Sequence, residues 1–139
     1  MTVFLDACAL IYRFEGNAGF RLATTTLLAQ LSAGHAATAV AVSRLSVLEC
    51  RVQPLRAGDQ ALLQRYDDFF AACRIVELSA AVVDAATMLR VRYALKTPDA
   101  LQAASAMSLS PEVRFVTGDQ GFAKVSGLDV RLIQPPSSV

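Results

Sequence analysis

The chain has 139 residues, of which 54% are hydrophobic and 18% are charged, and its formal net charge at pH 7 is +1. This length fits one domain with its own core, and the nearly neutral charge excludes a strongly basic protein that binds nucleic acid through its overall charge. Polar residues interrupt every apolar run before it reaches the roughly 18 residues that a membrane span needs. The N-terminus also lacks the basic start of a signal peptide. We therefore expect a cytoplasmic single domain over residues 1–139 with no membrane contact.

Short apolar segments typical of strands alternate along the chain with longer segments of helical spacing. In the first half the expected order is strand 2–5, helix 7–14, helix 20–33, strand 38–42, helix 43–57 and helix 59–72. Ser43 and Asp59 are good N-caps for the last two helices. Pro54 is expected to kink the helix over residues 43–57 or to end it early.

The second half continues the same alternation. The expected order is strand 74–78, helix 79–94, helix 97–109, strand 113–117, a short helix after Asp119 and strand 130–133. Thr97 is expected to cap its helix, with Pro98 at the first helical position. The alternation predicts an α/β fold with a mainly parallel sheet covered by helices on both faces, and in such folds ligands bind beyond the carboxyl ends of the strands.

Four of the twelve acidic residues lie in unusually apolar surroundings. Asp6 ends an apolar strand, where a carboxylate is costly unless it is paired or bound to a metal ion. Glu49 falls within the apolar stripe of its helix. Asp99 opens a nearly apolar helix, in which Gln102 is the other polar residue on the same side, and Asp119 comes just after a strand.

Each of these acids also has an ordinary structural explanation. The two that follow strands could be a helix cap and a turn residue, and Asp99 could interact favourably with the dipole of its helix. Glu49 could pair with Arg44 or Arg51. Taken together, however, several carboxylates at one end of a sheet need a counter-charge, and a hard divalent cation such as Mg²⁺ or Mn²⁺ supplies it.

Three segments that contain these acids resemble the PIN-domain family, and the resemblance is closest to the VapC toxins of bacterial toxin–antitoxin pairs. They are residues 46–49 (SVLE), 97–104 (TPDALQAA) and 116–122 (VTGDQGF). With the strand that ends in an aspartate near the N-terminus, the resemblance spans essentially the whole chain. The N-terminal match is looser, because many relatives carry Ser or Thr just after that aspartate, where this chain has Ala7 and Cys8.

The resemblance implies a three-layer α/β/α sandwich that cleaves RNA endonucleolytically. The four acidic positions of the family are matched by Asp6, Glu49, Asp99 and Asp119, and a supporting position that acts through a hydrogen bond is matched by Thr117. The implied cofactor is Mg²⁺ or Mn²⁺, held mainly by Asp6 and Asp99, which activates a water and leaves a 5′-phosphate. The implied partners are a VapB-type antitoxin, whose tail would occupy or crowd the active site, and a second copy of the chain in a homodimer.

Contacts to the RNA backbone are predicted only weakly. Four cations are the candidates, namely Arg13, Arg44, Arg92 and Lys96. Such contacts would give salt-dependent affinity and little choice of sequence. The apolar helices over residues 20–33 and 59–72 are plausible surfaces for a protein partner.

Other functions fit the sequence less well. A phosphatase of the haloacid-dehalogenase type needs a second aspartate two residues after the first, where this chain has Cys8. No glycine-rich phosphate loop follows the first strand, which disfavours nucleotide binding. Within the PIN-like class, an RNA-processing nuclease outside a toxin system and a catalytically inactive module that binds RNA or a partner remain as alternatives.

Overall fold

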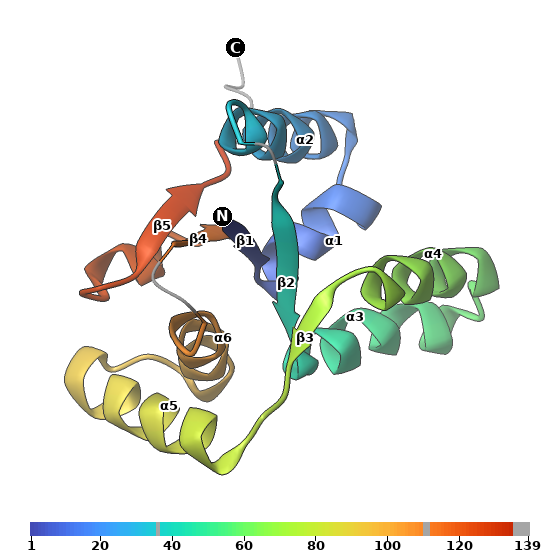
Figure 1. Ribbon diagram of the computed structural model, residues 1–139. Coiled ribbons are helices and arrows are strands. Elements are labelled where there is room, and N and C mark those ends of the chain that lie inside the picture. Colours follow the sequence, from blue (N-terminus) through green and yellow to red (C-terminus); the bar gives the residue numbers. More distant parts are fainter. Residues whose placement is uncertain (36, 110–111, 135–139) are drawn as a thin grey trace.

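A five-stranded sheet forms the centre of the protein (Figure 1), whose computed structural model describes residues 1–35, 37–109 and 112–134. The strands are β1 (Thr2–Leu5), β2 (Ala39–Ser43), β3 (Arg74–Val76), β4 (Val113–Thr117) and β5 (Asp129–Leu132). They lie in the order β3-β2-β1-β4-β5, and every neighbouring pair is parallel. The predicted α/β class with a parallel central sheet is therefore confirmed.

Helices connect the strands and form the two outer layers. They are α1 (Ala7–Glu15), α2 (Ala18–Ser32), α3 (Arg44–Ala57), α4 (Gln60–Ala71), α5 (Ala80–Tyr93) and α6 (Thr97–Met107), with a 3₁₀ helix, η1 (Gln120–Lys124), before β5. Helices α5 and α6 pack on one face of the sheet, and α1 to α4 pack on the other (Figure 1). This arrangement confirms the three-layer α/β/α sandwich. Among the described residues, no helix combines the length and the hydropathy that crossing a bilayer requires.

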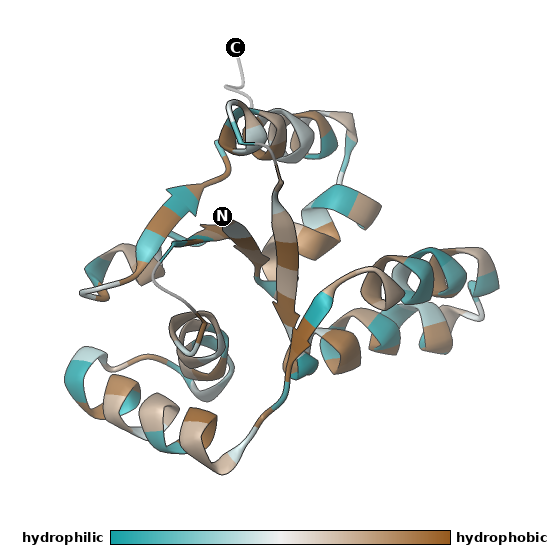
Figure 2. Cartoon of the chain, viewed as in Figure 1, coloured by the Kyte–Doolittle hydropathy of each residue, from teal (hydrophilic) through white to brown (hydrophobic). Residues whose placement is uncertain are grey.

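Side chains of the central strands alternate between two apolar cores, one on each face of the sheet. Phe4 of β1 points into the core under α5 and α6, whereas Val3 and Leu5 point into the core under α1 to α4. In β4, Phe115 stacks on Phe4 with ring centroids 5.5 Å apart. Because both faces are covered, β1 and β2 are hydrophobic along most of their length, as Figure 2 shows, and this is typical of a parallel sheet.

The order of the strands places a switch point beside β1. After β1 the chain adds β2 and β3 on one side, and after α5 and α6 it returns to place β4 on the other side of β1. In open parallel sheets, ligands bind at the carboxyl ends of the strands where the order reverses. Asp6 and Asp119 follow the two strands that border this point.

Pro54 does not end its helix early, so of the two predicted effects of this proline the shortening is wrong, whereas the predicted end of the helix at Gly58 is confirmed. Helix α3 continues through Pro54 to Ala57 and ends at Gly58, which has a left-handed backbone with φ of 66°. Pro54 is buried, and its carbonyl accepts the N–H of Asp59 at 2.9 Å. The proline therefore loses one helical bond close to the helix end and is held there by packing and by the following turn.

The predicted cap of α6 is also wrong. Thr97 is the first residue of the helix, and the cap position is Lys96, whose side chain makes no capping bond. The hydroxyl of Thr97 instead accepts a hydrogen bond from the guanidinium of Arg90 at 3.0 Å. Because this tertiary contact uses the hydroxyl, it overrides the local preference of threonine for a cap.

The turn after β4 leaves no room for a side chain at Gly118. A Cβ atom there would lie 2.5 Å from Cε2 of Tyr12 and 3.1 Å from Sγ of Cys8. Gly118→Ala should therefore lower the free energy of unfolding by about 1–3 kcal/mol, the usual cost of overpacking, as measured by urea denaturation. In a Tyr12→Ala background the same substitution should cost less. An equal cost in both backgrounds would show that the Tyr12 ring does not constrain this turn.

Candidate active site with four carboxylates

One pocket, of about 360 Å³, is lined by carboxylates from four separate segments of the chain. They are Asp6 after β1, Glu49 on α3, Asp99 on α6 and Asp119 after β4. The structure thus brings together the four acids that the sequence singles out, although they span more than one hundred residues. Ala7, Cys8, Ile11, Tyr12, Pro98, Gln102 and Phe122 complete the lining.

Asp6 is the most deeply buried of these acids, with 4% of its surface exposed. Its Oδ1 accepts the N–H of Ala9 at 2.8 Å and thereby caps α1, and its Oδ2 accepts the hydroxyl of Thr117 at 2.5 Å. The pKa of Asp6 is raised to about 6, mainly by burial and to a lesser degree by the charges of Asp99 and Asp119, and the two hydrogen bonds only partly offset this rise. The carboxylate of Asp6 therefore both caps α1 and lines the pocket.

Thr117 joins the ends of the two central strands. Its fully buried hydroxyl donates to Asp6 and accepts the N–H of Asp119 at 3.0 Å. The carboxylate of Asp119 in turn accepts the N–H of Gly121 at 2.8 Å and caps η1. One hydroxyl therefore fixes how the residues after β1 and β4 lie relative to each other.

Glu49 and Asp99 enter the pocket from helices on opposite faces of the sheet. Burial raises the pKa of Glu49 above its ordinary value. The amide of Gln102 lowers this pKa in part, and the charge of Asp99 raises it. Burial also raises the pKa of Asp99, and Asp119 raises it further, while Lys96 lowers it. The raised pKa values come mainly from burial, which the polar and charged groups nearby offset only in part.

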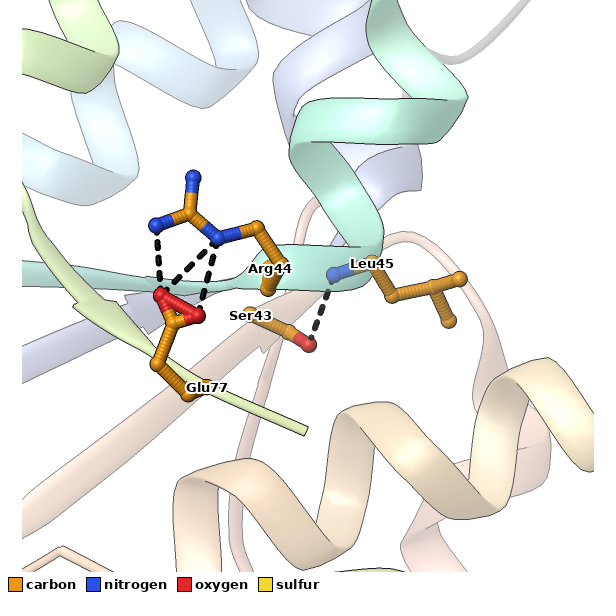
Figure 3. Close-up of polar contacts among 4 residues, drawn as sticks. All are labelled: Ser43, Arg44, Leu45 and Glu77. Carbon is orange, nitrogen blue, oxygen red and sulfur yellow. Dashed lines mark hydrogen bonds and ion pairs between the residues drawn. The ribbon is translucent and has the colours of Figure 1, made fainter. Parts of the chain in front are cut away.

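The two arginines that lie near Glu49 in the sequence bind other acids. The Nε of Arg44 donates to both carboxylate oxygens of Glu77, at 2.9 and 3.0 Å (Figure 3), and the Nε of Arg51 lies 3.4 Å from Asp67. The alternative in which one of them neutralises Glu49 is therefore wrong. Across residues 1–35, 37–109 and 112–134, the ion pairs that form leave all four pocket carboxylates without a lysine or arginine partner.

The oxygen ligands of the pocket suit a hard divalent cation. Within the described part of the chain, no three Asp, Glu, His or Cys side chains stand close enough to hold a metal ion by themselves. Mg²⁺, however, usually keeps several waters and is bound by only one or two carboxylates. Unpaired carboxylates with raised pKa values in an open pocket fit such a partly hydrated ion.

The four cations that the sequence suggests for RNA binding lie on separate segments. Lys96 is near enough to the carboxylates to lower the pKa of Asp99. Arg44 is occupied by its ion pair, Arg13 lies over an aromatic ring on α1, and Arg92 is exposed on α5. A role for these residues in RNA binding stays a prediction.

The sequence pattern did not single out two residues, one in the lining of the pocket and one bonded to a lining residue. Tyr12 lines the pocket beside Gly118, with its ring stacked on Phe20 at 4.4 Å between centroids. Ser46 is fully buried and accepts a hydrogen bond from Gln102 at 2.9 Å. The position of Ser46, one turn before Glu49 on the same helical face, is the signal that could have revealed it.

Comparisons with known proteins agree with this architecture. The sequence profile described as the PIN domain matches residues 3–128. No curated protein sequence matches the chain.

Similar solved structures include VapBC2 from Rickettsia felis bound to a DNA fragment from its promoter, with a TM-score of 0.76, 16% identity and coverage of 96% of this chain and 100% of that chain. A toxin–antitoxin complex from Klebsiella pneumoniae gives a TM-score of 0.72 at 21% identity, covering 96% and 99% of the two chains. VapBC-1 from nontypeable Haemophilus influenzae gives 0.74 at 12% identity, covering 95% and 98%. At these identities the likeness establishes the shared fold.

The raised pKa of Asp6 predicts how pH affects the stability of the metal-free protein. Between pH 3.8 and about 6, the folded state keeps a proton on Asp6 that the unfolded chain has lost, so stability falls as pH rises through this window. Asp6→Asn should remove the contribution of Asp6 to this dependence, leaving the smaller contributions of Glu49 and Asp99, and should raise the free energy of unfolding at pH 7 by about 3 kcal/mol. Denaturant titrations in EDTA at several pH values measure both effects.

Asp84→Asn is the matched control, because Asp84 is exposed on α5 outside the pocket. It should leave the pH profile of stability unchanged. A profile of Asp6→Asn that keeps the slope of the parent protein would contradict the assignment of the raised pKa to Asp6.

Proposed function

Because the chain belongs to the PIN-domain family, we propose that it is a Mg²⁺- or Mn²⁺-dependent endoribonuclease and the toxin of a VapBC-type toxin–antitoxin pair. The convergence of four carboxylates in a pocket where they have no lysine or arginine partner among the described residues is the observation that carries the proposal. Such a pocket suits the metal-assisted hydrolysis of a phosphodiester.

In this proposal Asp6 and Asp99 hold the cation, and Glu49 and Asp119 complete its coordination directly or through water. A bound divalent cation supplies the Lewis acidity that activates the attacking water and stabilises the leaving 3′ oxygen, so the product carries a 5′-phosphate. Thr117 keeps the Asp6 carboxylate in place through their hydrogen bond.

Removing one carboxylate tests the proposed activity. Asp99→Asn keeps the size of the side chain but removes its charge, so RNA cleavage should fall by about two orders of magnitude or more. EDTA should abolish cleavage by the parent protein, and added Mn²⁺ should restore it. Cleavage is followed on labelled RNA, with the exposed Asp84→Asn as the control that keeps full activity. Cleavage by Asp99→Asn at the parent rate would remove Asp99 from the mechanism.

Exposed apolar side chains support a protein partner. The helices over residues 20–33 and 59–72 stay predicted partner surfaces, and three large exposed apolar side chains also lie on α3, which the sequence did not suggest. Leu48, Val52 and Leu55 expose 62%, 38% and 61% of their surfaces, and with Leu78 they line a groove of about 540 Å³. A contiguous exposed apolar patch marks a surface that another protein covers. We assign this groove to the antitoxin, and a homodimer through other surfaces stays a prediction.

Expression in a bacterial host tests the toxin role. The chain alone should arrest growth, and Asp99→Asn should not. Coexpression with the protein encoded by the neighbouring reading frame should restore growth, and Leu48→Glu should weaken this rescue while leaving RNA cleavage intact, because Leu48 lies in the α3 groove and not in the carboxylate pocket.

Val91→Glu is the matched control, because Val91 exposes 75% of its surface on α5, outside the α3 groove and the carboxylate pocket. It should leave the rescue unchanged. RNA cleavage without growth arrest would instead favour an RNA-processing nuclease outside a toxin system, and the absence of both would favour an inactive binding module.

A further inference from the structure

Polar side chains pair in a regular register between α6 and the start of α3. The hydroxyls of Ser43 and Ser105 hydrogen-bond at 3.2 Å, and Nε2 of Gln102 donates to Oγ of Ser46 at 2.9 Å. All four residues are buried. The two pairs lie three residues apart on each segment and run in opposite directions along the chain, so they form two successive rungs of one polar ladder.

The next rung of this ladder brings Glu49 opposite Asp99. Residues three apart on a helix share a face, so the bond between Ser46 and Gln102 lies one helical turn from both carboxylates. The charge of Asp99 acts on Glu49, as expected for facing groups. Two rungs are closed by neutral hydrogen bonds, whereas the third consists of two like charges that do not bond to each other.

The environment of Gln102 is poorly explained by packing alone. Gln102 exposes 3% of its surface, and its Oε1 has no hydrogen-bond partner within the described segments. A buried acceptor without a partner costs about 1–3 kcal/mol, a cost that a methionine of similar length would avoid. The amide nitrogen, in contrast, is used, since it bonds to Ser46 and the amide lies near Glu49.

We propose that Gln102 is a positioning residue whose bond to Ser46 fixes α3 against α6 and so sets the separation of Glu49 and Asp99 for a divalent cation. The inference rests on the metal site of the proposed function. In this proposal Gln102 acts through the positions of the two carboxylates, because its bond to Ser46 lies one helical turn from both of them.

Direct measurement of Mn²⁺ binding by calorimetry tests this role without relying on activity. Gln102→Met removes the N–H donor at nearly constant length and should raise the Kd for Mn²⁺ by about 10-fold, the lower end of the effect of outer-sphere partners. Thermal stability should change little, because the variant also removes the acceptor that has no partner. Higher Mn²⁺ concentrations should restore kcat for RNA cleavage.

A second variant and a double variant isolate the hydrogen bond. Ser46→Ala should raise the Kd for Mn²⁺ by a similar factor, and it carries the test by itself if Gln102→Met does not fold. Because both substitutions break the same bond, the double variant should bind Mn²⁺ about as well as either single variant. Multiplied effects in the double variant would overturn the proposal.

Thr24→Val is the matched control for a lost buried hydrogen bond. The hydroxyl of Thr24 donates to the carbonyl of Phe20 at 2.8 Å within α2, outside the carboxylate pocket, so this variant should bind Mn²⁺ like the parent protein. Unchanged Mn²⁺ affinity of Gln102→Met would overturn this inference and leave the nuclease proposal standing. Failure of the parent protein to bind Mn²⁺ would overturn both.

Discussion

Burial of several carboxylates in one pocket is the constraint on which the rest of this structure depends. Burial raises the pKa of a carboxylate because water no longer stabilises the ionised form, and neighbouring carboxylates raise it further. Asp6 shows this most clearly, since its pKa rises to about 6 although it accepts two hydrogen bonds. A chain holds such groups together only if rigid elements fix each of them, and here a central strand, two helices and the turn after a second strand do so.

Two sets of hydrogen bonds lie beside the pocket carboxylates, one at the ends of two strands and one between two helices. The hydroxyl of Thr117 ties Asp6 to the backbone of Asp119 across the paired strands β1 and β4. The bond between Ser46 and Gln102 ties α3 to α6 one turn from the remaining two carboxylates. Both use neutral groups, which add no charge to the pocket.

The carboxylate pocket and the apolar groove of α3 are lined by different residues. The carboxylate pocket lies at the switch point of the sheet, whereas the largest exposed apolar side chains of α3 point into a different groove. Arg44 and Arg51 border that groove and are paired with Glu77 and Asp67, so their charges do not reach into the pocket to neutralise it. A partner bound in the groove would therefore cover apolar surface without having to replace an internal ion pair of the pocket.

The sequence by itself determined the alternation of strands and helices, the caps at Ser43 and Asp59 and the four acids in apolar company, because these depend on local patterns of residue type. Only the tertiary structure decided what those acids face. That Thr97 bonds to Arg90 in place of capping α6, and that Ser46 meets Gln102, depends on which helices the sheet brings together. Such contacts join residues far apart in the chain, and no local preference encodes their distance or orientation.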